Sequence, residues 1–180
     1  FLDGRKLITS ANGEKLTDAQ RSELMGYVAI ISENWQKVIA ESVFKYAGST
    51  YKSLVALEDV NNDDLAKEFS KYMKYWGELK GFSMALQVGK DNIGESATKL
   101  NRMIGFGPML MDETQIVGID SKGNYVMDKI YSMNDAKLHM LKIQKLMIDE
   151  FGVEARSNDM LADMADLASK IGTSESAEND

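Results

Sequence analysis

Apolar side chains recur at steps of three and four residues along most of the chain, which places them on one face of an α-helix. The first such stretch begins after Thr17, and Gln20 three residues later completes the pattern of a capping box. We expect this helix to run to about Tyr46. Gly48 then ends it or kinks it, and a helical pattern resumes over 51–58. The apolar face comprises Leu24, Tyr27, Val28, Ile31, Trp35, Val38 and Ile39.

The stretch from Tyr72 to Val88 is apolar or small almost all the way round, and it lies within a helix expected over about 64–89. A polar break at 59–64 precedes this helix, and Asp63 is its expected N-cap. A helix without a polar face is normally buried among other helices. Charged side chains within it must therefore find partners or keep a route to water. They are Lys74, Glu78 and Lys80.

A shorter helix is expected over Glu95–Ile104, because the sequence Gly-Phe-Gly-Pro at 105–108 is a strong helix stop. Residues 109–133 differ from the rest of the chain. The short segments Gln115–Ile119 and Asn124–Met127 contain β-branched residues, and a turn sequence separates them. This pattern predicts either a short β-hairpin or an irregular surface loop.

The C-terminal part of the chain again has a helical pattern. Asn134 is expected to cap a helix over 135–151, which Gly152 closes. A last helix is expected over 159–171. The tail at 173–180 has no apolar anchor, so we expect it to be disordered.

Composition favours a helical fold, because the 180 residues include one proline and twelve methionines. This length suits one domain with a substantial core. The sequence therefore predicts an all-α bundle of five or six helices in a single domain at 1–172. The first sixteen residues carry two turn signals, Asp3-Gly4 and Asn12-Gly13.

Charge and residue usage exclude several classes of function. A net charge of −7 argues against binding of nucleic-acid phosphates. The absence of cysteine excludes disulfides, thiolate metal sites and cysteine nucleophiles. No run reaches the roughly 18–20 apolar residues of a transmembrane helix. Because the chain starts at Phe1 and enters a polar turn, we expect a cut or processed end, which is compatible with removal of an export signal.

His139 is the only histidine, and Asp135 lies one helical turn earlier on the same face. The pair could share a metal ion, but a metal site needs three or four ligands. No His-Glu-x-x-His motif, Glu-x-x-His pair or Gly-x-Ser-x-Gly motif accompanies the histidine. We therefore expect His139 to be an exposed or partly buried helix residue, and we predict no metal site, no cofactor and no catalytic residue.

Two groups of polar side chains have spacings that suggest a binding site for a metal cation. Asp59, Asn61 and Asp63 match the opening of an EF-hand loop, but the glycine and glutamate required later in that loop are missing. We expect them to be polar loop residues instead. The same expectation holds for the residues that bracket the predicted hairpin turn, Asp120, Asn124 and Asp128.

Glu78 and Lys80 lie about 200° apart around the helix axis, so they cannot pair with each other. Each needs its own partner on another element. One interpretation is two ion pairs or hydrogen-bond networks that brace the bundle. The functional interpretation is a polar pocket between helices, with Trp76, Glu78, Lys80 and Tyr75 as ligand-binding residues. The aromatic side chains are expected mainly in the core, namely Trp35, Tyr72, Tyr75 and Trp76.

The run from Tyr72 to Gln87, centred on Trp-Gly-Glu-Leu-Lys-Gly-Phe at 76–82, resembles a motif of imelysin-like bacterial envelope proteins. The Gly-x-x-Pro stop at 105–108 resembles the segment after this motif in that family, and the helix that ends in Phe151-Gly152 is similar too. The resemblance covers about residues 17–152. It implies an all-helical fold and an exported, typically lipid-anchored protein that is longer than this chain, which would be its C-terminal half.

Imelysins proper carry a Gly-x-His-x-x-Glu motif that is linked to iron or another metal. In this chain no glycine lies two residues before His139, and Lys142 stands where the glutamate is expected. The metal site and any peptidase activity of the family therefore do not carry over to these residues.

The resemblance implies a non-enzymatic protein of the cell envelope or periplasm, associated with binding of an unknown small ligand or with metal uptake. One alternative is a metallopeptidase-like protein whose metal site lies in a missing N-terminal half. The other is a structural helical module that needs that half or a second chain as its partner.

Overall fold

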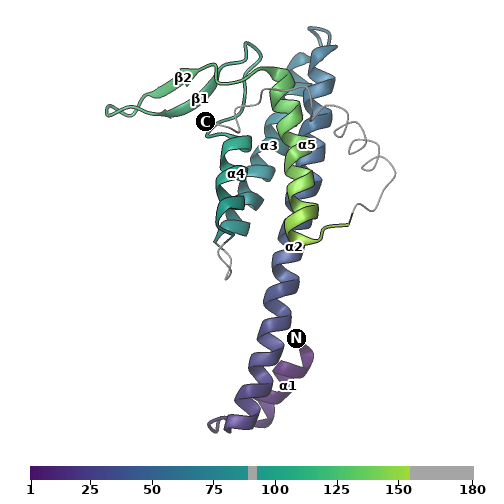
Figure 1. The fold of residues 1–180 in the computed structure, drawn as a ribbon, viewed down its shortest axis with the longest axis vertical. Helices are drawn as coiled ribbons and strands as arrows, with labels where there is room; N and C mark the ends of the chain where they lie inside the picture. The colour runs from purple at the N-terminus through teal and green to yellow at the C-terminus, as the bar shows by residue number, and fades with distance from the viewer. Residues whose placement is uncertain (89–92, 155–180) are drawn as a thin grey trace. The chain divides into compact units, whose positions relative to one another are not determined.

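A computed structural model describes residues 1–88 and 93–154, and Figure 1 shows the elements. This part of the chain forms five helices and one two-stranded hairpin, so the predicted all-α fold with a short hairpin is confirmed. The helix expected over 159–171 and the tail at 173–180 lie outside the described residues. The elements are α1 Leu2–Ser10, α2 Asp18–Glu58, α3 Leu65–Gln87, α4 Glu95–Ile104, β1 Gln115–Ile119, β2 Tyr125–Asp128 and α5 Met133–Phe151.

The chain divides into two compact units, Phe1–Val38 and Ile39–Asp180, and α2 contributes turns to both. This helix starts at the predicted capping box. The Gln20 side chain accepts a hydrogen bond from the Thr17 amide at 2.9 Å, and the Thr17 hydroxyl accepts one from the Gln20 amide at 3.2 Å. The alternative that Gly48 ends the helix is wrong, because α2 continues through it.

In the first unit, α1 packs against the first turns of α2. A β carbon placed on Gly4 would lie in van der Waals contact with Leu24 and Tyr27, at 3.6 and 3.5 Å. The turn predicted at Asp3-Gly4 is therefore wrong, because both residues lie in α1, where Gly4 packs against α2. The second turn signal is confirmed, because φ is +48° at Asn12 and +85° at Gly13.

The apolar face of α2 is not buried within the first unit. Trp35, expected in the core, is 67% exposed. Val28 and Ile31 on the same face are 42% and 41% exposed. The prediction for Trp35 is wrong because the one other helix of this unit, α1, has only nine residues and packs at the Leu24 end of the face.

The core of the second unit is formed by the later turns of α2 together with α3, α4 and α5. Helix α5 runs alongside α2 in Figure 1, and the Gln144 side chain donates a hydrogen bond to the Phe44 carbonyl at 3.3 Å. Fully buried apolar residues come from all four helices, and they include Val43, Phe44, Ala47, Leu54, Leu79, Leu86, Leu100, Ile104, Ile143 and Met147.

Helix α3 is central to this unit, as Tyr72 and Leu79 are buried in its core. The expectation that the helix is buried all round is wrong. Met84 is 55% exposed, because the described elements cover only one side of α3. The N-cap of α3 is Asp64 rather than the expected Asp63, and its side chain forms no capping hydrogen bond.

The N-cap of α5 is Ser132, not the predicted Asn134. The Ser132 hydroxyl accepts a hydrogen bond from the Asp135 amide at 3.2 Å, and the Asp135 carboxylate accepts one from the Ser132 amide at 3.1 Å. Because this reciprocal capping box forms at Ser132, Asn134 lies inside the helix and does not act as its N-cap. The predicted closure at Gly152 is confirmed by its left-handed conformation, with φ +59° and ψ +35°.

The hairpin of β1 and β2 is antiparallel, with Gln115 opposite Asp128 and Ile119 opposite Tyr125. Its presence decides between the two alternatives that the sequence left open for 109–133. None of the helices in residues 1–88 and 93–154 combines the length and apolar character that a membrane crossing requires.

Candidate functional site

Trp76 and Lys80 lie one turn apart on α3, and both donate hydrogen bonds to the end of α4. The Trp76 indole nitrogen donates to the Ile104 carbonyl at 3.1 Å, and the Lys80 ammonium donates to the Gly105 carbonyl at 2.5 Å. The last carbonyl groups of a helix lack partners within it and carry the negative end of its dipole. These two side chains therefore cap α4 from a neighbouring helix.

Lys80 is a half-buried cation, and burial lowers its pKa. Within residues 1–88 and 93–154 its polar partner is the Gly105 carbonyl, and no carboxylate pairs with it. Only a carbonyl and the end of a helix dipole thus offset its charge. Such a group can attract an anion.

Gly105 connects Lys80 with a second set of polar side chains. With φ at +80°, Gly105 adopts a conformation that favours glycine. A β carbon at this residue would lie 3.3 Å from the Gln115 side-chain oxygen and 3.3 Å from the Tyr131 hydroxyl. The turn after α4 therefore brings groups from α3, β1 and the segment before α5 around one residue.

Of the polar groups around this turn, Tyr72 and Gln115 are buried and Tyr131 is half-buried. Burial raises the pKa of Tyr131 to about 12, and the Gln115 side chain partly offsets this effect. Burial also raises the pKa of Tyr72, whose hydroxyl accepts a hydrogen bond from the Met109 amide at 2.9 Å. Gln115 is 1% exposed, and its amide atoms have no well-aligned hydrogen-bond partner among the described residues. A buried amide in this state is costly unless water or a ligand satisfies it.

His139 also belongs to this buried region. Only 2% of it is exposed, so the expectation of an exposed or partly buried histidine is wrong. Its ring meets the Tyr131 ring edge to face, with centroids 4.7 Å apart and planes at 75°. Asp135 uses its carboxylate to cap α5. Across the described ranges, no three histidine or acidic side chains are grouped so that they could hold a metal ion.

Tyr75 and Glu78 contact a different element, because they meet Tyr46 on α2. A hydrogen bond with the Glu78 carboxylate raises the pKa of Tyr46, and the rings of Tyr46 and Tyr75 lie 6.4 Å apart. The prediction that Glu78 and Lys80 find separate partners on other elements is confirmed. The four candidate side chains thus form two sets, Tyr75 with Glu78 and Trp76 with Lys80. Their role in ligand binding stays a prediction.

Members of both groups with cation-like spacing, Asn61 in the first and Asp120 with Asn124 in the second, form hydrogen bonds in local turns. The Asn61 side-chain oxygen accepts a hydrogen bond from the Asp64 amide at 3.0 Å. The Asp120 carboxylate accepts from the amides of Lys122 and Asn124, both at 2.8 Å. Hydrogen bonds, first of all with the Asn124 side chain, lower the pKa of Asp120. These contacts agree with the expectation of polar loop residues.

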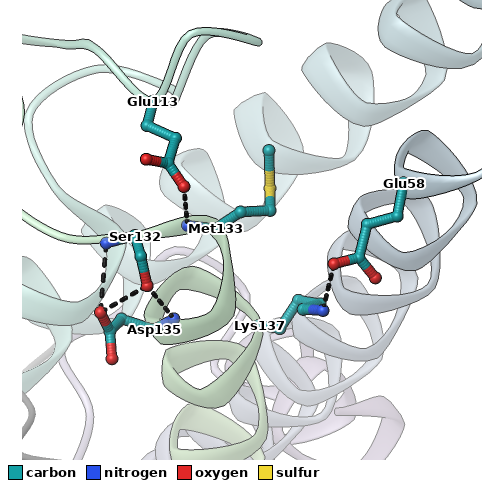
Figure 2. A network of polar contacts seen from close by, with 6 residues as sticks. All are labelled: Glu58, Glu113, Ser132, Met133, Asp135 and Lys137. Atoms are coloured by element: carbon teal, nitrogen blue, oxygen red, sulfur yellow. Dashed lines mark hydrogen bonds and ion pairs between the residues drawn. The ribbon is translucent and has the colours of Figure 1, made fainter.

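Figure 2 shows contacts at the start of α5 that the sequence did not reveal. Lys137 pairs with Glu58 of α2 at 2.6 Å, and the Glu113 carboxylate accepts a hydrogen bond from the Met133 amide at 3.0 Å. The partners lie far apart along the chain, so no local spacing signals them. The sequence analysis also did not identify Gln115 as a buried polar residue of the site. Its position as a polar residue at the start of an apolar strand is a signal that could have indicated this.

Comparisons with family models, with curated proteins and with solved structures gave no match to this chain. The resemblance to imelysin-like proteins therefore stays a prediction, and any function must be argued from the geometry of the site.

Proposed function

We propose that this chain is a non-enzymatic, imelysin-like protein of the bacterial cell envelope that binds a small anionic ligand beside Lys80. The observation that carries the proposal is the meeting of two incompletely satisfied groups at Gly105. One is the Lys80 ammonium, which has a carbonyl but no carboxylate as partner in the described residues. The other is the buried amide of Gln115, close to the same turn.

The chemistry of these groups favours an anion over a metal ion. Lys80 supplies positive charge, and the Gln115 amide supplies N–H donors. The Tyr131 hydroxyl, whose pKa burial raises to about 12, is protonated at neutral pH like that of any tyrosine and can donate a hydrogen bond. Charge-assisted hydrogen bonds of this kind suit carboxylate and phosphate groups.

The contacts of α3 join the two sequence segments on which the proposed imelysin-like resemblance rests. The two sequence segments that resemble the family, 72–87 and 105–108, are separate along the chain. Trp76 and Lys80 from the first segment nevertheless donate to the carbonyls of residues 104 and 105. The two segments therefore depend on each other physically. Side chains of 72–87 cap the C-terminal end of α4, and 105–108 is the segment at which α4 stops.

The proposal is tested by isothermal titration calorimetry with inorganic phosphate and with citrate as probe anions. We expect the wild-type chain to bind at least one of them, and Lys80→Met to bind at least about tenfold more weakly through loss of the charge. Lys74→Met is the matched control, because Lys74 is an exposed lysine on the same helix and its substitution should leave binding unchanged.

Circular dichroism of each variant separates loss of binding from loss of folding. A wild-type chain that binds neither anion contradicts the proposal. A folded Lys80→Met variant that binds as tightly as the wild type also contradicts it.

A further inference from the structure

We propose that Glu113 is a positioning residue for the anion site, because it holds Gln115 and Tyr131 at a fixed separation. This role rests on the function proposed above, since both groups belong to the same site. The Glu113 carboxylate accepts a hydrogen bond from the Met133 amide at 3.0 Å, and Figure 2 shows the side chain reaching this first residue of α5. Gln115 follows Glu113 by two residues, and Tyr131 lies two residues before the start of α5. The contact therefore ties together the two segments that carry these groups.

Glu113 occupies a backbone position that favours glycine. Residues 111–113 form a three-residue hairpin loop. The Leu110 amide donates to the Thr114 carbonyl at 2.7 Å, and the Glu113 amide donates to the Leu110 carbonyl at 2.9 Å. The last residue of such a loop adopts the left-handed conformation, and φ is +65° at Glu113. Because a side chain with a β carbon is strained in this conformation, a glutamate here costs stability, and its contact with Met133 is what the chain gains in exchange.

This loop is also anchored beside the site. Met109 is buried and pairs with Gln115 across the base of the loop. The pairing of β1 with β2 ends at Gln115 and Asp128, three residues before Tyr131. The bond from Glu113 to the start of α5 therefore continues the connection beyond the point where the pairing of the strands ends.

The separation of Gln115 and Tyr131 matters because both lie against Gly105. A β carbon at Gly105 would be 3.3 Å from the Gln115 side-chain oxygen and 3.3 Å from the Tyr131 hydroxyl. An anion held at this turn by Lys80 can accept from both groups only if each lies within hydrogen-bond distance. A displacement of about 1 Å is enough to lose this alignment. Glu113 thus acts on the ligand through the other two side chains.

His139 provides a readout of this geometry that needs no ligand. It is the only histidine of the chain, and its ring meets the Tyr131 ring edge to face with centroids 4.7 Å apart. The ring current of the tyrosine shifts the NMR signals of the imidazole by an amount that depends on their distance and angle. Movement of Tyr131 therefore changes the His139 signals.

NMR of the histidine ring and calorimetry with phosphate and citrate, both on the complete chain, test this role. Glu113→Ala and Glu113→Gly remove the carboxylate, so both should move the His139 signals and weaken anion binding at least about tenfold. Glu113→Gln keeps an acceptor oxygen and should restore the signals and the binding. Glu58→Gln is the matched control, because it changes the other carboxylate that contacts the start of α5, through Lys137, and should leave both readouts unchanged.

Urea unfolding of the same variants separates positioning from folding. Glu113→Gly relieves the backbone strain that Glu113→Ala keeps, so it should unfold at the higher urea concentration of the two. Anion binding should nevertheless be equally weak in both. A merely structural role would instead make binding follow stability.

Unchanged His139 signals in a folded Glu113→Gly variant overturn the assignment, and so does unchanged affinity where the wild type binds. A Glu113→Gln variant that behaves like Glu113→Ala overturns it as well, as does an equal loss of binding in Glu58→Gln. A wild-type chain that binds neither anion overturns the proposed function instead. The His139 signals then still decide whether Glu113 holds Tyr131 in place.

Discussion

Gly48 of α2 lies directly against Gln144 of α5, and a β carbon at Gly48 would be 2.6 Å from the Gln144 side-chain nitrogen. A glycine inside a helix costs about 1 kcal/mol relative to alanine. At this position the missing side chain leaves space for a buried amide that donates to the Phe44 carbonyl. The residue that looks like a helix stop in the sequence is therefore a packing residue between two helices.

Gly48→Ala should lower the free energy of unfolding by about 1 kcal/mol, because the gain in helix propensity is outweighed by displacement of Gln144 from its hydrogen bond. Gly26→Ala is the control on the same helix, since nothing lies within 4 Å of its added β carbon. It should raise the free energy of unfolding by up to about 1 kcal/mol. Urea unfolding measures both values, and changes of the same sign would contradict the assignment.

Ser132→Ala should lower the free energy of unfolding by about 1 kcal/mol, because it removes the N-cap of α5. Asn134→Ala should change it by less than about 0.5 kcal/mol, since this residue lies past the cap. Thermal or urea unfolding of the two variants compares a cap that only the structure identifies with the cap expected from sequence. A larger loss for Asn134→Ala would show that the capping box is misassigned.

Tyr131 should make the protein less stable as the pH rises above 10. The pKa of its hydroxyl is about 12 in the folded chain and about 10 in the unfolded chain, so the unfolded state loses its proton first. The contribution is complete below pH 10 and is lost as the pH rises to about 12. Its size is on the order of 2 kcal/mol.

Urea unfolding as a function of pH tests this prediction. Tyr131→Phe should flatten the decline between pH 10 and 12. Tyr125→Phe, on an exposed residue of β2, serves as the control and should leave the decline unchanged. An unchanged slope in Tyr131→Phe would show that Tyr131 keeps an ordinary pKa in the folded chain.

Sequence-based predictions were most accurate where the determinants lie within one turn or one helix. The capping box at Thr17 and Gln20, the stop after Ile104 and the closure at Gly152 depend on neighbours three or four residues away, and all three are confirmed. The opposite directions of Glu78 and Lys80 follow from helix geometry alone. Their separate partners on α2 and at the end of α4 agree with that geometry.

Predictions that needed knowledge of the neighbours were the ones that went wrong. Gly48 interrupts no helix because α5 packs on it, and Trp35 is exposed because its unit has only the short α1 beside it. His139 is buried because α5 turns that face toward Tyr131. Helical periodicity shows that a face exists, but not which element covers it.

Local patterns in the amino-acid sequence were enough to predict an all-α chain and to identify the helix that carries Trp76 and Lys80, whereas they left a hairpin and an irregular loop as alternatives for residues 109–133. Hydrogen bonding and side-chain spacing suffice for such features, since they act over a few residues. The meeting of Lys80 with Gly105, and the approach of Gln115 and Tyr131 to the same turn, became visible only in the folded chain. These contacts join distant segments, and their energies depend on packing and burial that no local pattern encodes.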